Sequence, residues 1–195
     1  MSPFSQVGLL LINTIGSMAL FIIILRFLLQ LVHADFYNPI SQFLVKATNP
    51  VLIPLRRIIP GFAGLDVASL VLAYIVQALL FAAIFLFAGY DLPWANILLW
   101  APVGLFALVL NIYFWGLVVT VVASWIAPGS YNPALILINQ ILEPVVRPIR
   151  KMMPDMGGLD LSPILVFLAI KVVEIMVLGP LVQMLQIPRG LIIGL

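Results

Sequence analysis

The sequence predicts an all-α membrane protein whose four transmembrane helices form two helical-hairpin repeats of the same orientation, joined within each repeat by an interfacial amphipathic connector. Three observations lead to this fold class. Of the 195 residues 64% are hydrophobic and only 8% are charged, four segments are long and apolar, and one basic, proline-rich phrase occurs twice. A soluble domain carries about a quarter charged residues and could not bury so much apolar surface in one core. We therefore expect lipid to be the main solvent of this chain.

Four apolar segments are predicted to span the membrane, because a helix of about 20 residues crosses the hydrocarbon with its backbone hydrogen bonds satisfied internally. They are Val7–Val32, Val67–Ala88, Ile97–Ile126 and Leu161–Ile187. No Lys or Arg precedes the first apolar run, so we interpret it as a retained span rather than a cleaved signal peptide. The long third region could hold an additional interfacial piece, and Gly179-Pro180 predicts a kink in the fourth span.

The phrases NPVLIPLRRIIPGFAGLDVAS and EPVVRPIRKMMPDMGGLDLSP align without a gap at an offset of 94 residues. The repeated motif positions are Asn38, Pro39, Pro50, Pro54, Pro60 and Asp66 in the first copy, and Asn132, Pro133, Pro144, Pro148, Pro154 and Asp160 in the second. This agreement indicates an internal duplication into residues 1–90 and 91–195, each a span, a basic connector and a span. Because two spans separate equivalent points, both repeats face the same way, related by a pseudo-two-fold axis along the membrane normal.

Each connector is expected to begin with a short interfacial helix, capped by Asn38 or Asn132 with proline at its first position. Helical spacing places its apolar face at Ile40, Phe43, Leu44 and Ala47 in the first copy, and at Ala134, Leu137, Ile138 and Ile141 in the second. A basic segment follows, bounded by prolines that are expected to prevent one long helix from running through. The Gly-Leu-Asp that ends each connector predicts a turn and an Asp N-cap for the next span.

The basic residues of the connectors predict the orientation and a contact surface. They are Lys46, Arg56 and Arg57 in the first connector and Arg147, Arg150 and Lys151 in the second. The positive-inside rule places both connectors in the cytoplasm and both termini in the periplasm. We expect these cations to contact anionic headgroups, each contributing on the order of 1 kcal/mol. A docking surface for a partner protein is the alternative.

Five polar residues within the predicted spans are further candidates for function: Arg26, Gln77, Asn111, Lys171 and Glu174. A charge at the bilayer centre costs about 2.5–3.5 kcal/mol, so ionisable residues there are functional candidates by default. Lys171 and Glu174 are three residues apart and can pair on one helix face. We expect a pair that fixes packing against a neighbour, and an ion or proton relay is the alternative. Arg26 is expected to snorkel to the headgroups.

Several classes of function are not expected. The chain has no cysteine and one histidine, which excludes disulfides and cysteine-ligated metal sites, and we predict no metal or other cofactor. It shows no nucleotide-binding loop, nucleophile triad or paired-carboxylate signature, so we predict no enzymatic activity. The net charge of +2, without a basic stripe interleaved with aromatic residues, argues against a nucleic-acid partner.

The doubled motif, Asn-Pro followed by Pro-x3-Pro-[Ile/Leu]-Arg-[Arg/Lys]-x2-Pro and Gly-[Leu/Ile]-Asp, resembles that of the YggT family, also called YlmG. The resemblance covers essentially the whole chain, and HADFYNPISQFLVKATNPVLIPLRRIIP is similar to the proteobacterial form. It implies a multi-pass protein of the bacterial inner membrane. The family's Arg-x3-Ser-Trp element before each Asn-Pro is split here, with Arg26 in the first repeat and Ser124-Trp125 in the second.

The resemblance names no reaction and no catalytic residue. Bacterial members are associated with osmotic or envelope stress, potassium uptake and cell division, and plastid relatives with the assembly of haem-bearing membrane complexes. Two hypotheses follow. The first is a non-enzymatic accessory or scaffold protein that supports membrane-complex assembly or a stress response, with anionic lipid and a membrane protein or a second copy as partners. The second is a small, potassium-linked ion channel or transport factor.

Overall fold

The computed structural model describes residues 3–62, 64–126, 129, 131–153, 160–188 and 190–192. Within them the chain is helical, with no strand. Four stretches are long and apolar enough to cross a membrane: α1 (Pro3–Leu31), α3 (Val67–Ala88), α4 (Trp94–Ile126) and Ser162–Met184. The last stretch comprises α6 (Ser162–Val173), a π-helical turn η1 (Glu174–Leu178) and α7 (Gly179–Met184). The connectors form α2 (Pro39–Ile58) and α5 (Pro133–Met152), and the predicted fold class is confirmed.

The spans follow the predicted segments closely, with two local differences. The third region is one helix of 33 residues with Pro102 inside it, so the additional interfacial piece is absent from the part of it that the structure describes. The fourth span widens into the π-helical turn directly before Gly179-Pro180. Pro180 has no N–H, and its ring conflicts with the carbonyl four residues earlier, so a wider turn accommodates it.

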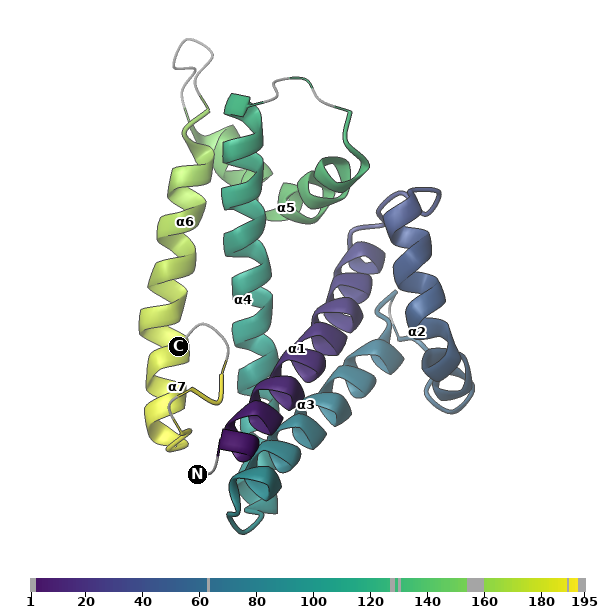
Figure 1. The fold of residues 1–195 in the computed structure, drawn as a ribbon. Coiled ribbons are helices and arrows are strands. Elements are labelled where there is room, and N and C mark those ends of the chain that lie inside the picture. The colour runs from purple at the N-terminus through teal and green to yellow at the C-terminus, as the bar shows by residue number, and fades with distance from the viewer. Residues whose placement is uncertain are drawn as a thin grey trace.

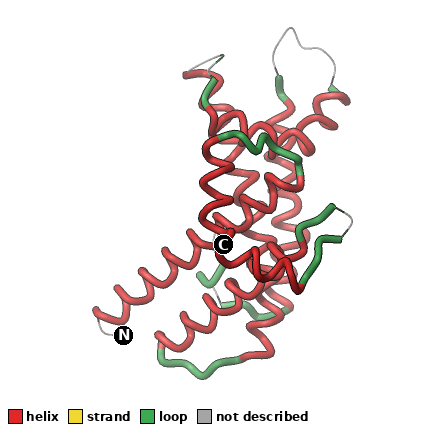
Figure 2. Tube along the Cα trace, turned by 90° about the vertical axis from the view of Figure 1, so that its right-hand side faces the viewer, coloured by secondary structure: helices red, strands yellow, loops and turns green. Residues whose placement is uncertain are grey.

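The spans are arranged as two pairs, α1 with α3 and α4 with α6, and the pairs are inclined to each other (Figure 1). Turned by 90°, the helix that begins at the N-terminus is again inclined to the upright helices (Figure 2). The start of α1, the α3–α4 connection and the end of α7 lie toward one end of the molecule, whereas α5 lies at the other (Figure 1). An even number of spans between equivalent points produces this arrangement.

The hydrophobic core of the described residues forms three clusters, two of which cross from one repeat to the other. One cluster joins α1, α2 and α3 with residues of α4 and α5, and it includes the fully buried Leu20 and Ile24. A second joins α3 and α4 to α7 and the segment after it, around Phe81 and Trp100. A third joins α4, α5 and α6 around Val166. Each connector therefore packs against the spans of its own repeat, and α5 also packs against the first repeat through Leu137 and Ile141.

The expectation that prolines would end the connector helices early is wrong. Each connector is a single helix of 20 residues, with Pro50 and Pro54 inside α2 and Pro144 and Pro148 inside α5. Prolines four residues apart lie on one face, and all four are exposed. Each proline lacks an N–H, so the carbonyl four residues earlier has no helical hydrogen bond. On the outward face this is tolerated, because a helix that wraps around a core is convex on that side. Pro60 follows the end of α2, and Pro154 lies outside the described residues.

Candidate functional site

The N-terminal ends of the two connectors are capped as predicted and meet each other. The Asn38 side chain accepts a hydrogen bond from the Ile40 N–H, and the Asn132 side chain accepts one from the Ala134 N–H, both at 2.9 Å. Asn38 also donates from Nδ2 to the Pro133 carbonyl at 2.8 Å. The predicted caps are confirmed, and the first cap additionally ties one repeat to the other.

An arginine–aspartate pair, placed equivalently in the two repeats, ties the end of each connector to the start of the next span. In the first repeat Arg56 Nη2 lies 2.5 Å from Asp66 Oδ2. In the second, Arg150 Nε lies 2.9 Å from Asp160 Oδ2. Arg150 and Asp160 each lie 94 residues after Arg56 and Asp66, the offset that relates the two repeats. From the sequence, the arginines were expected to contact headgroups or a partner and the aspartates to cap the next span. Their pairing was not predicted, although the ten-residue spacing that both repeats share was a signal for it.

The carboxylates of these pairs also start the following spans. Asp66 is the N-cap of α3, as predicted, and accepts hydrogen bonds from the Ser69 N–H at 3.3 Å and from its hydroxyl. Asp160 lies one residue before the N-cap of α6 and accepts from the Ser162 N–H at 2.9 Å. Asp160 was predicted to be the N-cap itself, and it lies one residue earlier. The serine that it binds, Ser162, is also one residue earlier than the position equivalent to Ser69.

The two pairs differ in burial. The Asp66 side chain is 3% exposed, whereas the Asp160 side chain is 42% exposed. Burial raises the pKa of Asp66, but hydrogen bonds from Arg56 and Ser69 outweigh it and leave the pKa lowered. Burial likewise raises the pKa of Asp160, and hydrogen bonds from Ser162 with the charge of Arg150 leave it lowered. Both carboxylates are therefore stabilised in their charged form by this geometry.

We expect the protein to lose stability in acid through these two carboxylates. Because their folded pKa values are lowered, the stabilisation is present above the unfolded aspartate pKa of about 3.9 and is lost as the pH falls through the folded values. Melting temperatures in detergent measured between pH 7 and pH 3 should fall at the acid end. A double Asp66→Asn/Asp160→Asn variant should show a flatter profile, and an unchanged acid-end slope would contradict the assignment.

The other four connector cations face outward. Lys46, Arg57, Arg147 and Lys151 are exposed, and the structure gives them no ion pair or hydrogen bond with another described residue. They remain candidates for contact with headgroups or a partner. Arg56 and Arg150 are instead engaged within the protein, although Arg150 is half-exposed.

The structure shows which residues of the two connector helices pack against the spans. The structure buries Ser41, Leu44, Thr48 and Leu52, whereas Phe43 is 60% exposed and Ala47 is exposed. In α5 the buried residues are Leu137, Ile141, Leu142 and Val146, with Ala134 and Ile138 half-buried. On the packed face of α2, Thr48 is directed toward α1, where its hydroxyl oxygen accepts a hydrogen bond from Arg26.

The Arg26 guanidinium is held by polar groups of α2, and its snorkelling to the headgroups stays a prediction. The residue is 6% exposed and donates from Nη1 to the Val45 carbonyl at 3.3 Å and to the Thr48 hydroxyl oxygen. The Thr48 hydroxyl in turn donates to the Leu44 carbonyl at 2.6 Å. Here α2 covers the guanidinium and supplies its hydrogen-bond acceptors.

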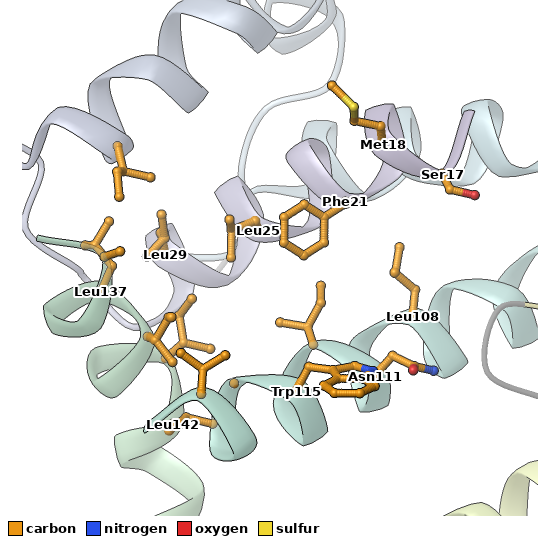
Figure 3. A pocket seen from close by; sticks show the side chains of 17 residues that line it. Ser17, Met18, Phe21, Leu25, Leu29, Leu108, Asn111, Trp115, Leu137 and Leu142 are labelled. Atoms are coloured by element: carbon orange, nitrogen blue, oxygen red, sulfur yellow. The ribbon is translucent and has the colours of Figure 1, made fainter. Parts of the chain in front are cut away.

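The remaining polar residues of the spans lie in separate surroundings. Gln77 is buried where α3 meets α4, and its side chain lies against Gly104. Asn111 donates to the Ala107 carbonyl at 3.1 Å and lines an apolar cavity of about 540 Å³ between α1, α4 and α5. Figure 3 shows Asn111 beside Trp115 in this cavity, with Phe21 of α1 across from them.

Lys171 and Glu174 form the predicted ion pair. Lys171 Nζ lies 2.7 Å from Glu174 Oε2 and 4.7 Å from the centroid of the Phe114 ring. The lysine side chain is 51% exposed and the glutamate side chain 18% exposed. The pair lies where α6 passes into η1, and it contacts α4 through the Phe114 ring. It is thus at the surface of the chain rather than in its interior.

The fold and its doubled connector define a class: a multi-pass membrane protein built from two repeated helical hairpins. The family model CCB3/YggT matches residues 5–87 and 99–181, and the chain belongs to this family. The resemblance found in the sequence is confirmed. No solved structure matches the chain.

Three relatives show how far the similarity extends. An uncharacterised protein of Pseudomonas aeruginosa is 48% identical over 100% of both chains. An uncharacterised protein of Vibrio alginolyticus is 37% identical over 88% of this chain and 95% of its own. The uncharacterised protein YggT of Escherichia coli K12 is 37% identical over 84% of this chain and 85% of its own.

Proposed function

We propose that this protein is an accessory or scaffold protein of the bacterial inner membrane, which binds a membrane partner through an exposed face of its fourth span. In this proposal the connectors lie in the cytoplasm and the termini in the periplasm. The observation that supports it is the Lys171–Glu174 ion pair on the surface of the chain, and we infer its mid-membrane depth from helix geometry. A role in membrane-complex assembly or in osmotic or envelope stress is part of the proposal and rests on the family resemblance.

The depth of the pair follows from helix geometry. Lys171 is nine residues beyond the start of α6 at Ser162. At 1.5 Å per residue it lies roughly 14 Å into the span, near the middle of a hydrocarbon layer about 30 Å thick. A charge at this depth costs about 2.5–3.5 kcal/mol when it faces lipid. Covering the pair with a partner that contributes polar contacts removes this cost.

The face that carries Lys171 is continuous and apolar. Ile164 and Leu168 are each 61% exposed, and Ile175 is 73% exposed. With Lys171 they follow the spacing of one helix face, so the lysine is set among side chains that face the surroundings of the chain. A transmembrane helix with a complementary polar group fits this surface, because polar contacts between helices contribute to association in lipid.

The cytoplasmic contribution comes from the outward-facing connector cations. Lys46, Arg57, Arg147 and Lys151 are exposed and available to anionic headgroups or to an acidic partner surface. Basic residues beside a membrane contribute on the order of 1 kcal/mol each at an anionic surface. They would hold the connectors in the headgroup layer and so set the orientation of the scaffold.

A second candidate function is favoured by the same pair. In a homo-oligomer whose α6 faces meet, the ionisable pairs of two copies would line a shared interface at mid-membrane, as an ion pathway requires. Within one chain, Gln77 packs against Gly104 and Asn111 lines an apolar cavity, so the scaffold is the first candidate and the channel the second.

The test compares three proteins extracted from native membranes in nanodiscs and examined by mass spectrometry: the wild type, a Lys171→Leu/Glu174→Met variant and a Leu79→Met/Leu86→Met control on the exposed face of α3. We expect a stoichiometric membrane partner with the wild type and the control, and its loss from the charge-free variant. A partner-free oligomer that conducts ions in liposomes, with conduction lost in the charge-free variant, would overturn the scaffold and support transport.

A further inference from the structure

A second cavity, of about 650 Å³, lies between α1 and α2 at the connector end of the first repeat. Its lining differs in character from the apolar cavity. The polar side chains that line it are Arg26, Gln30, His33, Ser41, Asn49 and Arg56. This set has hydrogen-bond donors of four kinds, guanidinium, amide, hydroxyl and imidazole, and it has no carboxylate.

The cavity carries an unbalanced positive charge. Arg56 is paired with Asp66 at the start of α3, and it also donates to Gln30 Oε1 at 3.0 Å. Arg26 donates hydrogen bonds to a hydroxyl and a carbonyl and forms no ion pair with a described residue, so the one carboxylate that acts on it, Asp66, serves two guanidinium groups. A buried charge is costly unless it is paired. An anion in the cavity would supply the missing partner.

A buried hydroxyl supports the same conclusion independently. Ser41 is 6% exposed, and its Oγ is fully enclosed without a hydrogen-bond partner among the described residues. Buried polar atoms without partners are uncommon and call for an explanation. Ser41 lines the cavity, so a bound oxygen atom could accept its proton. The serine and the arginine together therefore indicate an oxyanion.

We propose that this cavity binds a phosphate group, with Arg26 supplying the unbalanced charge and Arg56 and Ser41 supplying hydrogen bonds. Arginine forks match phosphate oxygens in geometry and charge. Arg26 lies five residues before the end of α1, so its Cα is roughly 8 Å below the end of that span. This places the cavity beside the headgroup layer, from which either a phospholipid headgroup or free phosphate can enter.

The second repeat supplies a natural comparison. At the positions of Arg26, Ser41 and Asn49 it has Thr120, Leu135 and Glu143. Glu143 Oε2 lies 3.9 Å from Arg150 Nη1, so a carboxylate of the protein itself approaches the equivalent arginine. The charge that attracts an anion and the hydroxyl that binds it are both absent from this copy. The proposed site is therefore a property of the first repeat.

The test uses the full chain in neutral detergent and three probes: phosphatidylglycerol, diacylglycerol with the same acyl chains, and inorganic phosphate. Retention of lipid is measured by native mass spectrometry, and binding of phosphate by the shift in melting temperature. The variants copy the second repeat, Asn49→Glu and Ser41→Leu, and leave Arg26 with its contacts to α2. Arg57→Gln, which removes an exposed cation outside the cavity, is the matched control.

We expect the wild type and the control to bind phosphatidylglycerol or phosphate, and Asn49→Glu to weaken this binding about tenfold, because its carboxylate competes for the arginines. Ser41→Leu should weaken it through loss of the hydroxyl. Preference for phosphatidylglycerol over both other probes identifies a lipid headgroup as the source, and binding of inorganic phosphate identifies a free anion. Equal binding by wild type and Asn49→Glu, equal retention of diacylglycerol, or no binding by the wild type would overturn the proposal.

Discussion

Replacing Asp66 by Asn is expected to lower the free energy of unfolding by about 3 kcal/mol, the low end of the range for breaking a buried ion pair. The Asp66 carboxylate is 3% exposed, pairs with Arg56 and caps α3 through Ser69. Asparagine keeps the cap geometry but leaves the arginine without its counter-charge. The loss stays at the low end because the Arg56 side chain is 37% exposed and is partly solvated.

The second repeat supplies the control for this substitution. Asp160→Asn removes the equivalent partner of Arg150, but both side chains of that pair are more than two-fifths exposed. Exposed pairs contribute about 0–1 kcal/mol, so the loss should stay below about 1 kcal/mol. Unfolding titrations in mixed detergent micelles measure both variants. Equal losses in the two repeats would show that burial does not distinguish the pairs.

Replacing Gly16 by Leu is expected to lower the free energy of unfolding by about 3 kcal/mol, the upper end of the range for overpacking a well-packed site. The loss arises where α1 packs against α3. A Cβ at Gly16 would overlap the side chain of Leu80 on α3. Leu80 is 6% exposed and belongs to the cluster that joins α1, α2 and α3, so it has little room to withdraw. The helices would have to separate where they now lie in contact.

The matched control for this substitution is Gly116→Leu on α4. A Cβ at Gly116 would lie 3.4 Å from Ile138 Cγ2, and the residue lines the apolar cavity, where a larger side chain has space. In a helix, leucine is also more favourable than glycine, by just under about 1 kcal/mol. We expect no loss of stability in the same micelle titration. A loss that matches that of Gly16→Leu would mean that close approach of α1 to α3 is not the cause.

Features that depend on local chemistry could be predicted from the sequence. The spans follow from runs of apolar residues, because a helix alone satisfies its backbone in lipid. The asparagine caps follow from a side chain that binds a backbone N–H two residues away. The duplication, the family and the Lys171–Glu174 pair required only spacing along the chain, and for these the structure and the comparisons agree with the sequence.

The connectors show where local rules were insufficient. Proline is an unfavourable residue inside a helix, and this led to the expectation of a short helix followed by a separate basic segment. The structure continues the helix through Pro50 and Pro54, because both lie on the outward face while the inward face packs on the spans. Tertiary packing thus outweighs the local cost, and only the position of α2 on the spans shows which face this is.

By itself the sequence determined the class of the protein, four spans in two repeated hairpins, because membrane insertion and helix capping depend on residues close together in the chain. Only the tertiary structure decided what the charged residues do. Arg56 and Arg150 bind aspartates across a turn, Arg26 is buried beneath α2, and Ser41 faces a cavity with a positive charge. Each outcome depends on how one helix crosses another. Crossing geometry is set by the whole packed surface, and residue spacing in one segment does not specify it.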